Sequence, residues 1–390
     1  MKIALDAATT LPEDGTAGTL LARVWLPDAG PVPALLRGDD MIDLSRVSPT
    51  MATLLALPDM AARLAAAEGA RIGSIADIVA NSALDGRDPA RPWLLAPCDL
   101  QAVKACGVTF ASSMLERVIE SEARGDAMAA EGIRRTLSAE IGSDLSKVKP
   151  GSDQAMKLKA ALVERGLWSP YLEVGIGPDA EVFTKCPPMA AVGTGVEVGI
   201  HAVSEWNNPE PEIVVVVDPS GTIIGATLGN DVNLRDVEGR SALLLGKAKD
   251  NNASAAIGPF IRLFDATFGL DDVRAADVSL RVEGDDGFAL DGKSSMRLIS
   301  RDPTELVAHT IGPHHQYPDG FLLYTGTMFA PTKDRGGPGK GFTHHPGDIV
   351  TISSPRLGQL TNRVEKAHDV EPWTFGTSAL MRSLAARQLL

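Results

Sequence analysis

The sequence has little cysteine and no long apolar run. Its 390 residues include three cysteines, Cys98, Cys106 and Cys186, and none belongs to a Cys-x-x-Cys pair. This odd, unpaired count excludes a disulfide framework and a zinc ribbon, so a reducing cytoplasm is the simplest compartment. No stretch approaches the roughly 18 apolar residues that a membrane-spanning helix requires. The chain also meets Asp6 too early for a signal sequence. We therefore expect a soluble, cytoplasmic protein without a membrane partner.

The sequence also lacks an excess of basic residues. Asp and Glu total 50 against 37 Lys and Arg, which gives a formal net charge of −13. Nucleic-acid-binding proteins present positive charge to phosphates, and this balance argues against that class. An acidic protein that binds a small anionic substrate needs positive charge at its site, and a metal ion can supply it.

The character of the sequence changes along the chain. Residues 1–97 are interpreted as a small mixed α/β domain that ends in a proline-rich linker, and residues 98–390 as a second domain. Residues from about 125 to 170 have the apolar spacing of helices and form a helical insertion. Short β-branched runs separated by Asp-Gly turns follow. The pattern predicts an α+β fold with a β-rich body of barrel-like or sandwich type.

Two apparent motifs do not fit their surroundings. Residues 287–294 match the phosphate-loop pattern Gly-x4-Gly-Lys-Ser, but an apolar strand occupies the middle and no helix follows, so we expect no nucleotide there. The doublets His314-His315 and His344-His345 suggest a metal site. Neighbouring residues on a strand point to opposite faces, however, and no cysteine accompanies them. We favour surface or substrate-contacting histidines over metal ligands.

Three carboxylates are expected to converge. Glu210 and Glu212 precede the apolar run IVVVV, and residues two apart on an extended segment share one face. The chain turns at DPSG and returns to Asp231, 19 positions after Glu212, as a hairpin of matching strands requires. Clustered carboxylates repel one another unless a cation joins them, and all-oxygen ligation favours magnesium, manganese or calcium. The alternative is that the two glutamates are solvated charges at a strand entry.

Cations and hydroxyls accompany the carboxylates. Arg235 and Lys247 follow Asp231 closely, and cations beside such a site bind an anionic substrate or transfer protons. The simpler alternatives are a salt bridge from Arg235 to a neighbouring acidic residue and a surface lysine at 247. Thr325 and Thr327 end an apolar run, where their hydroxyls can hold a carboxylate or keto oxygen.

In this order the pieces resemble the fumarylacetoacetate hydrolase family. The matching segments are Glu210-x-Glu212, GNDVNLRD, GKAKD followed by IGP, DGFLLYTGT and GDIVTISSPRLGQLTNRVE, within residues 180–366. The resemblance implies a β-rich roll with a smaller N-terminal domain, assembled as a homodimer or homotetramer. It also implies a divalent cation, Mg²⁺ with Mn²⁺ as the alternative. The ligands that it implies are Glu210, Glu212 and Asp231.

The family contains several reactions, and residues 107–116 help to separate them. Hydrolytic members resemble G-x-N-Y-x-x-H-x-x-E there, with a His–Glu pair that activates water. This chain has Ser113 at the histidine position and Glu116 at the glutamate position. Serine cannot act as an imidazole base, so the pair is incomplete. The whole chain resembles bacterial 2-keto-3-deoxy-D-xylonate dehydratases of oxidative pentose catabolism, which implies dehydration of a 2-keto-3-deoxy-pentonate to 2,5-dioxopentanoate.

The resemblance leads to a hypothesis for the mechanism. The metal polarises the 2-keto acid, and Lys247 removes the proton at carbon 3. Glu116 serves as the acid or orders a water molecule, and Ser113 holds a water or a substrate hydroxyl. The expected contacts to substrate oxygens are Arg235, Thr325 and Thr327. The alternatives are an acylpyruvate hydrolase, an oxaloacetate decarboxylase and a non-catalytic keto-acid-binding protein.

Overall fold

All the strands of the described residues belong to two sheets. The computed structural model describes residues 1–140, 148–164, 166, 168–329, 331, 333–337 and 340–390. In spatial order, the larger sheet contains β4 (Arg71–Ser74), β3 (Asp40–Asp43), β2 (Gly30–Arg37), β1 (Leu20–Leu26), β11 (Ala255–Leu263), β10 (Ile223–Asp231), β9 (Pro211–Val217), β14 (Phe321–Tyr324), β6 (Ala102–Gly107) and β7 (Glu181–Cys186), while β5 (Trp93–Leu95) pairs with β1. The smaller sheet contains β13 (Ala289–Ser295), β12 (Asp277–Glu283), β15 (Ile349–Ser354), β16 (Gly358–Lys366) and β8 (Glu197–Ile200). The β-rich α+β fold is confirmed. Over the described ranges, however, both sheets are open and no closed barrel forms.

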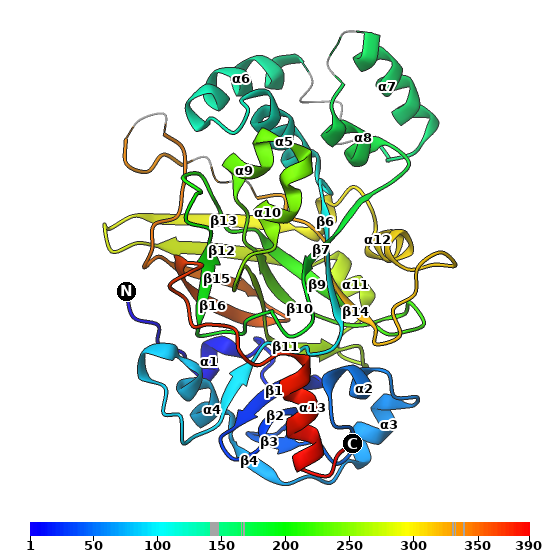
Figure 1. Ribbon diagram of the computed structural model, residues 1–390. Coiled ribbons are helices and arrows are strands. Elements are labelled where there is room, and N and C mark those ends of the chain that lie inside the picture. The colour runs from blue at the N-terminus through cyan, green and yellow to red at the C-terminus, as the bar shows by residue number, and fades with distance from the viewer. Residues whose placement is uncertain (141–147, 165, 167, 330, 332, 338–339) are drawn as a thin grey trace.

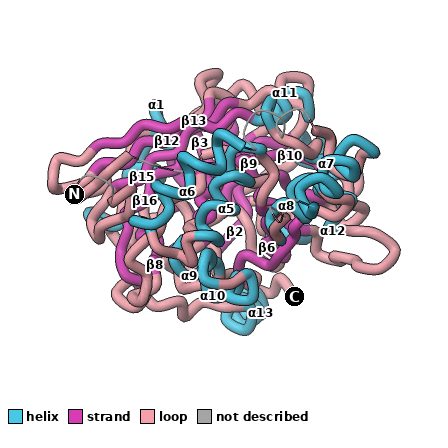
Figure 2. Tube along the Cα trace, turned by 90° about the horizontal axis from the view of Figure 1, so that it is seen from above, coloured by secondary structure: helices cyan, strands magenta, loops and turns pink. Residues whose placement is uncertain are grey.

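The helices gather at the two ends of the molecule and along its sides (Figure 1). Their bounds are α1 (Ala7–Thr10), α2 (Met51–Leu55), α3 (Met60–Ala66), α4 (Ile75–Ser82), α5 (Ala111–Glu122), α6 (Ala127–Glu140), α7 (Asp153–Glu164), α8 (Pro170–Ile176), α9 (Arg235–Arg240), α10 (Leu245–Lys249), α11 (Leu270–Arg274), α12 (Pro303–Thr310) and α13 (Thr377–Ala386). Seen from above, α5 to α8 lie over the strands (Figure 2). Helices α6 and α7 occupy the expected insertion, of which residues 141–147, 165 and 167 lie outside the described residues.

The larger sheet continues from the N-terminal strands into the body of the protein. Strand β1 pairs with β11, with Leu20 opposite Arg262 and Leu21 opposite Ile261. The C-terminal helix α13 returns to this end, where the Ser383 hydroxyl donates to the Ala29 carbonyl at 2.9 Å. The division of the chain at residue 97 stays a prediction.

Strand β9 is buried on both faces. Its residues Ile213, Val215 and Val217 pack into the core that includes the smaller sheet, whereas Val214 and Val216 pack into a core on the opposite side. A continuous β-branched run is typical of such a strand, because side chains alternate between the two faces. The apolar run that follows Glu212 therefore anchors the candidate site in the centre of the fold.

Other sequence expectations have clear structural counterparts. The phosphate-loop-like segment forms strand β13, which pairs with β12 in a hairpin, so it has the wrong geometry for a phosphate loop. The three cysteines are free and buried. Within the described residues, no helix is long and apolar enough to cross a membrane.

Candidate active site

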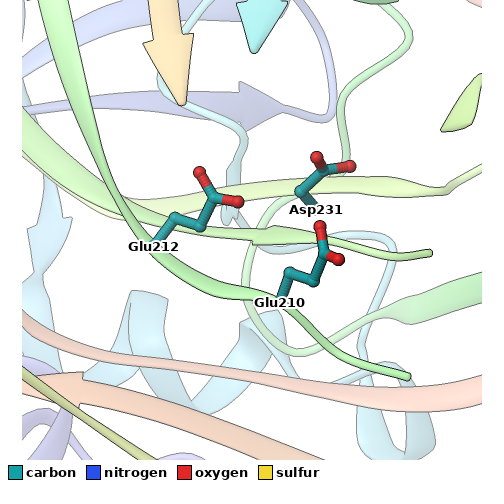
Figure 3. Close-up of side chains that lie close together, drawn as sticks. All are labelled: Glu210, Glu212 and Asp231. Carbon is teal, nitrogen blue, oxygen red and sulfur yellow. The ribbon is translucent and has the colours of Figure 1, made fainter. Parts of the chain in front are cut away.

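The hairpin of β9 and β10 brings three carboxylates together. Glu212 pairs with Gly229, and the Asp231 amide donates to the Glu210 carbonyl at 3.1 Å. Oxygens of the Glu210, Glu212 and Asp231 side chains lie within 4.8 Å of one another, and all three residues are buried. Figure 3 shows the carboxylates converging from the two neighbouring strands. The expected hairpin thus forms, and it brings these groups close enough together that they could hold a metal ion. We call them the carboxylate triad.

The triad is an electrostatically costly arrangement. Burial, together with the charges of Asp231 and Glu210, raises the pKa of Glu212 well above its usual range. The Gly326 amide donates to Glu212 Oε2 at 2.6 Å and partly offsets this effect. A divalent cation would relieve the repulsion, because it would stabilise the charged form of each carboxylate.

Two buried lysines border the triad. Lys249 Nζ, at the end of α10, lies 2.5 Å from Glu210 Oε2 and 2.9 Å from Asp231 Oδ2. Lys185 Nζ, on β7, lies 3.0 Å from Asp231 Oδ1. Burial opposes ionisation of Asp231, but the two ammonium groups outweigh it and lower the pKa of this carboxyl group. Burial likewise opposes the charge on Lys249, and Asp231 and Glu210 raise its pKa. Lys249 therefore carries its proton in these surroundings.

A second layer of charge comes from α5. Residues 113, 116, 117 and 120 share one helical face because they recur at intervals of three and four. Arg117 reaches Glu210 Oε1 at 2.5 Å and Glu120 Oε2 at 2.7 Å, and its third carboxylate partner is Glu238 at 3.1 Å. Arg117 thereby connects the triad to α5 and α9.

Arg235 also contacts the carboxylates of α5. Its guanidinium lies 2.6 Å from Glu120 and 3.3 Å from Glu116, and it stacks 4.3 Å from the centre of the Trp206 ring. The simple alternative of a salt bridge to a sequence neighbour is wrong, because the partners belong to α5. Arg235 lines the cavity with a guanidinium that is already bound by carboxylates.

The triad lies at the wall of a small cavity with an excess of acidic groups. The acidic residues lining this cavity are Glu116, Glu120, Glu181, Glu210, Glu212, Asp231 and Glu238. The basic residues lining it are Arg117, Arg235 and Lys249. This imbalance in a buried space favours the binding of an additional cation.

The predicted site residues fall into two groups. Ser113, Glu116, Arg235 and Thr327 all line the cavity with the triad. The Ser113 hydroxyl also donates to the Phe110 carbonyl at 3.0 Å, within the first turn of α5. Thr325 is not among the lining residues.

Thr325 and Lys247 have other surroundings. The Thr325 hydroxyl is buried and donates to the Ile213 carbonyl at 2.9 Å, so it fastens β14 to β9. The Lys247 side chain is exposed and is not among the cavity residues. Two positions along a helix correspond to a rotation of about 200°, so Lys247 and Lys249 face opposite ways. The lysine at the triad is Lys249, which corrects the sequence-based assignment of Lys247.

Sequence reasoning missed Lys185, Arg117 and Glu181 as well. The helical period of α5 offered a signal for Arg117, because it follows Ser113 by four positions. Lys185 and Glu181 are on β7, whose place at the site depends on pairing with β6. That contact is long-range and has no signature in a single sequence.

Glu181 has an unusual environment for a carboxyl group. It lies against Gly107, where a side chain would collide with Glu181 Oε2. Burial, with a further contribution from the charge of Glu238, raises the pKa of Glu181 to about 7. A carboxyl group that titrates near neutrality suits proton transfer.

We expect Glu181→Gln to raise the melting temperature of the metal-free protein at pH 8 and to change it little at pH 5. The folded state holds the Glu181 proton more tightly than the unfolded state does. Its contribution to stability is therefore complete below pH 4.5 and is lost as the pH rises through about 7. Differential scanning calorimetry in EDTA at the two pH values checks this result. An equal shift at both would contradict it.

The histidine doublets lie away from the cavity. His314, His315 and His345 are exposed. His344 is buried with Nδ1 3.3 Å from Asp348 Oδ2. Among the described residues, those that line the carboxylate cavity include none of these four histidines.

The fold and the carboxylate triad define a fumarylacetoacetate hydrolase-like domain. Residues 177–365 match the family model described as "Fumarylacetoacetate (FAA) hydrolase C-terminal".

More specific similarities exist within that class. The chain is 30% identical over 190 residues to the 2-dehydro-3-deoxy-D-arabinonate dehydratase of Saccharolobus solfataricus, covering 49% of this chain and 60% of that protein. It is 31% identical over 194 residues to a protein of Haloferax volcanii named as a probable 2-keto-3-deoxyxylonate dehydratase, covering 50% and 63%. The matches thus span about three fifths of these relatives' lengths.

A solved structure shares the fold. It is named "2-keto-3-deoxy-D-arabinonate dehydratase complexed with magnesium and 2,5-dioxopentanoate". The TM-score is 0.61 at 22% sequence identity, and the superposition covers 89% of this chain and 99% of that one. The likeness therefore extends beyond the matched family domain to most of the architecture.

Proposed function

We propose that this protein is a hydro-lyase that removes water from a 2-keto-3-deoxy-pentonate to give 2,5-dioxopentanoate, in oxidative pentose catabolism. The observation that carries the proposal is the buried carboxylate triad bordered by Lys249 and Glu181. The names of the two curated relatives and of the solved dehydratase complex support the substrate class. A homodimer or homotetramer and a cytoplasmic location stay predictions.

The residues present fit a divalent cation, for which we propose Mg²⁺, with Mn²⁺ as the alternative. All three proposed ligands offer carboxylate oxygens, which these ions prefer. Among the described residues, the buried Asp231 Oδ1 has an ion pair with Lys185 but no well-directed hydrogen bond, so this oxygen is available for ligation. When bound at Glu210, Glu212 and Asp231, the cation supplies Lewis-acid polarisation of the substrate's carboxylate and 2-keto oxygens.

Three side chains are candidates for proton transfer. Lys249 borders the triad, so it is our first candidate for moving the proton at carbon 3. The uncompensated carboxylates raise the pKa of Lys249, so this lysine holds its proton. To act as a base it needs a lower pKa, which another positive charge at the triad would provide. Glu181 and Glu116, on other walls of the cavity, are candidates for protonating the departing hydroxyl.

The walls account for the remaining contacts. Thr327 offers a hydroxyl and Arg235 a positive guanidinium to the substrate's oxygens. Ser113 can hold a water molecule or a substrate hydroxyl. The cavity volume of about 30 Å³ suits an ion or a water molecule. A five-carbon substrate therefore needs wall side chains to move aside.

The second candidate function is hydrolysis of acylpyruvates or decarboxylation of oxaloacetate. Ser113 occupies the position where hydrolytic relatives are expected to carry histidine, and the described histidines lie outside the cavity. These observations favour dehydration. A keto-acid-binding protein without turnover is the remaining alternative.

Removal of divalent cations is expected to abolish dehydration, and added magnesium to restore it. The purified protein is dialysed against EDTA and incubated with 2-keto-3-deoxy-D-xylonate, and the semialdehyde product is followed by a coupled dehydrogenase. Turnover without metal would disprove the cofactor. Turnover of acylpyruvate or oxaloacetate in place of the pentonate would assign the second function, and binding without turnover would assign the third.

A further inference from the structure

A second cavity lies at the N-terminal end of the molecule. Its volume is about 470 Å³, within the range of small-molecule sites. Its walls come from β1, β5, the segment 189–197, the turn at 252–253 and the C-terminal segment 370–375. The described residues that line it are all different from those lining the carboxylate cavity. The second cavity is thus a separate space.

Arg23 is a buried cation in this cavity. Two carboxylates also line the cavity, Glu197, which pairs with Arg363 at 2.6 Å, and the exposed Glu371. Arg23 is 5% exposed, and its guanidinium donates to the Cys98 carbonyl at 3.0 Å and to Met189 Sδ at 3.4 Å. The other buried lysines and arginines in the described part of the chain each have a carboxylate within 4.0 Å: Lys185, Arg235, Lys249, Arg262, Arg301 and Arg335. No such partner of Arg23 is found among the described residues.

The nearest buried carboxylate is already engaged. Asp99 accepts hydrogen bonds from the backbone amides of Met51 at 2.6 Å, Ala52 at 2.9 Å and Leu100 at 2.7 Å, so it caps the start of α2. Burial lowers the pKa of Arg23, with only partial compensation from the more distant Asp99 charge. A buried cation is costly unless an anion neutralises it.

A second guanidinium and a set of aromatic rings complete the walls. Arg87 lies 5.2 Å from the centre of the Trp93 ring, and its Nε is buried without a hydrogen-bond partner among the described residues. Trp93 stacks on Trp25 with ring centres 5.6 Å apart, and Phe375 meets Trp25 edge to face at 5.2 Å. The cavity therefore combines incompletely satisfied cationic donors with a flat apolar surface.

We propose that this cavity is a binding site for a small organic carboxylate with an apolar or planar body. Arg23 neutralises the carboxylate, Arg87 adds a donor, and the tryptophan pair packs against the body of the ligand. Arginine suits a carboxylate because its donors form a rigid fork. The proposal requires neither the metal nor the reaction proposed for the other cavity.

Tryptophan fluorescence tests the proposal directly, because Trp25, Trp93 and Trp373 line the cavity. Phenylacetate is the probe, added to the intact protein in magnesium buffer. We expect a saturable change in emission, with phenylacetamide and sulfate each binding at least about tenfold more weakly, because one lacks the charge and the other the apolar body. Equal binding of phenylacetamide, or no saturation by phenylacetate, would overturn the proposal.

Matched arginine variants locate the binding. Arg23→Met is expected to raise the dissociation constant of phenylacetate at least about tenfold, and Arg87→Met by several-fold. Arg37→Met is the control, because Arg37 donates to the backbone carbonyls of Ala67 and Leu64 but lies outside the cavity. An equal effect of Arg37→Met, or unchanged affinity in both cavity variants, would refute the site.

Two further measurements separate a ligand site from a structural role or an interface. Arg23→Met should melt at or above the wild-type temperature, because it removes a buried unpaired charge. A lower melting temperature with unchanged phenylacetate affinity would make Arg23 structural. If Trp373→Ser lowers the oligomeric state in sedimentation and phenylacetate does not bind the wild type, a second copy covers the cavity and the proposal is wrong.

Discussion

Lys249→Met is expected to lower kcat of the proposed dehydration by at least about a hundredfold, the effect of losing a proton-transfer group. Lys247→Met is expected to leave kcat within about threefold, because its exposed side chain is absent from the cavity lining. The two lysines are on the same short helix and receive the same substitution. A difference between the variants therefore reflects where the ammonium group lies. Steady-state kinetics with saturating magnesium and 2-keto-3-deoxy-D-xylonate measures both.

The melting temperature and magnesium affinity of the two variants serve as controls. Lys249 contacts Glu210 and Asp231, so its removal frees carboxylate oxygens, and magnesium should still bind to Lys249→Met. Loss of kcat with retained magnesium binding assigns Lys249 to the chemical step. A decrease below about threefold would move proton transfer to Glu181 or Glu116.

Glu212→Gln is expected to abolish magnesium binding and to reduce activity at least about a hundredfold, because one of the three proposed anionic ligands becomes a neutral amide. The raised pKa of Glu212 shows that its charge is costly in the folded protein. The metal-free variant should therefore be at least as stable as the wild type, so the loss is not one of folding. Titration calorimetry with magnesium chloride and thermal melting in EDTA check both statements.

A carboxylate away from the triad provides the control. Glu283 belongs to the edge hairpin of the smaller sheet and pairs with Arg281, so Glu283→Gln should leave magnesium affinity and kcat unchanged. Full magnesium binding by Glu212→Gln would remove it from the proposed ligands. Loss of binding in both variants would point to a general electrostatic effect.

The part of the site that follows local rules was predictable. Glu210, Glu212 and Asp231 belong to one hairpin, and the alternation of strand side chains together with the length of the returning strand placed them together. The β-rich architecture followed from β-branched runs and turn residues in the same way. These features depend on short segments, and a single sequence contains the information for them.

The part that depends on distant segments was not predictable. Lys185 reaches Asp231 only because β7 pairs with β6, and β6 in turn pairs in parallel with β14. The choice between Lys247 and Lys249 depends on which face of a five-residue helix turns inward, and the sequence GKAKD gives too little apolar periodicity to decide. Whether the sheets stay open or close into a barrel likewise depends on pairing between distant strands.

The lysines and the arginine that contact the triad have a consequence for how the protein would acquire the proposed metal. Lys249, Lys185 and Arg117 balance part of the triad's charge from within the chain, so we expect the chain to fold without an ion. Such a protein differs from small zinc domains, in which metal binding provides the folding free energy. Metal supply in the cell would then set how much of the protein is active while leaving its abundance unchanged. A shortage of the metal would leave folded but inactive protein, which would regain activity when the metal binds again.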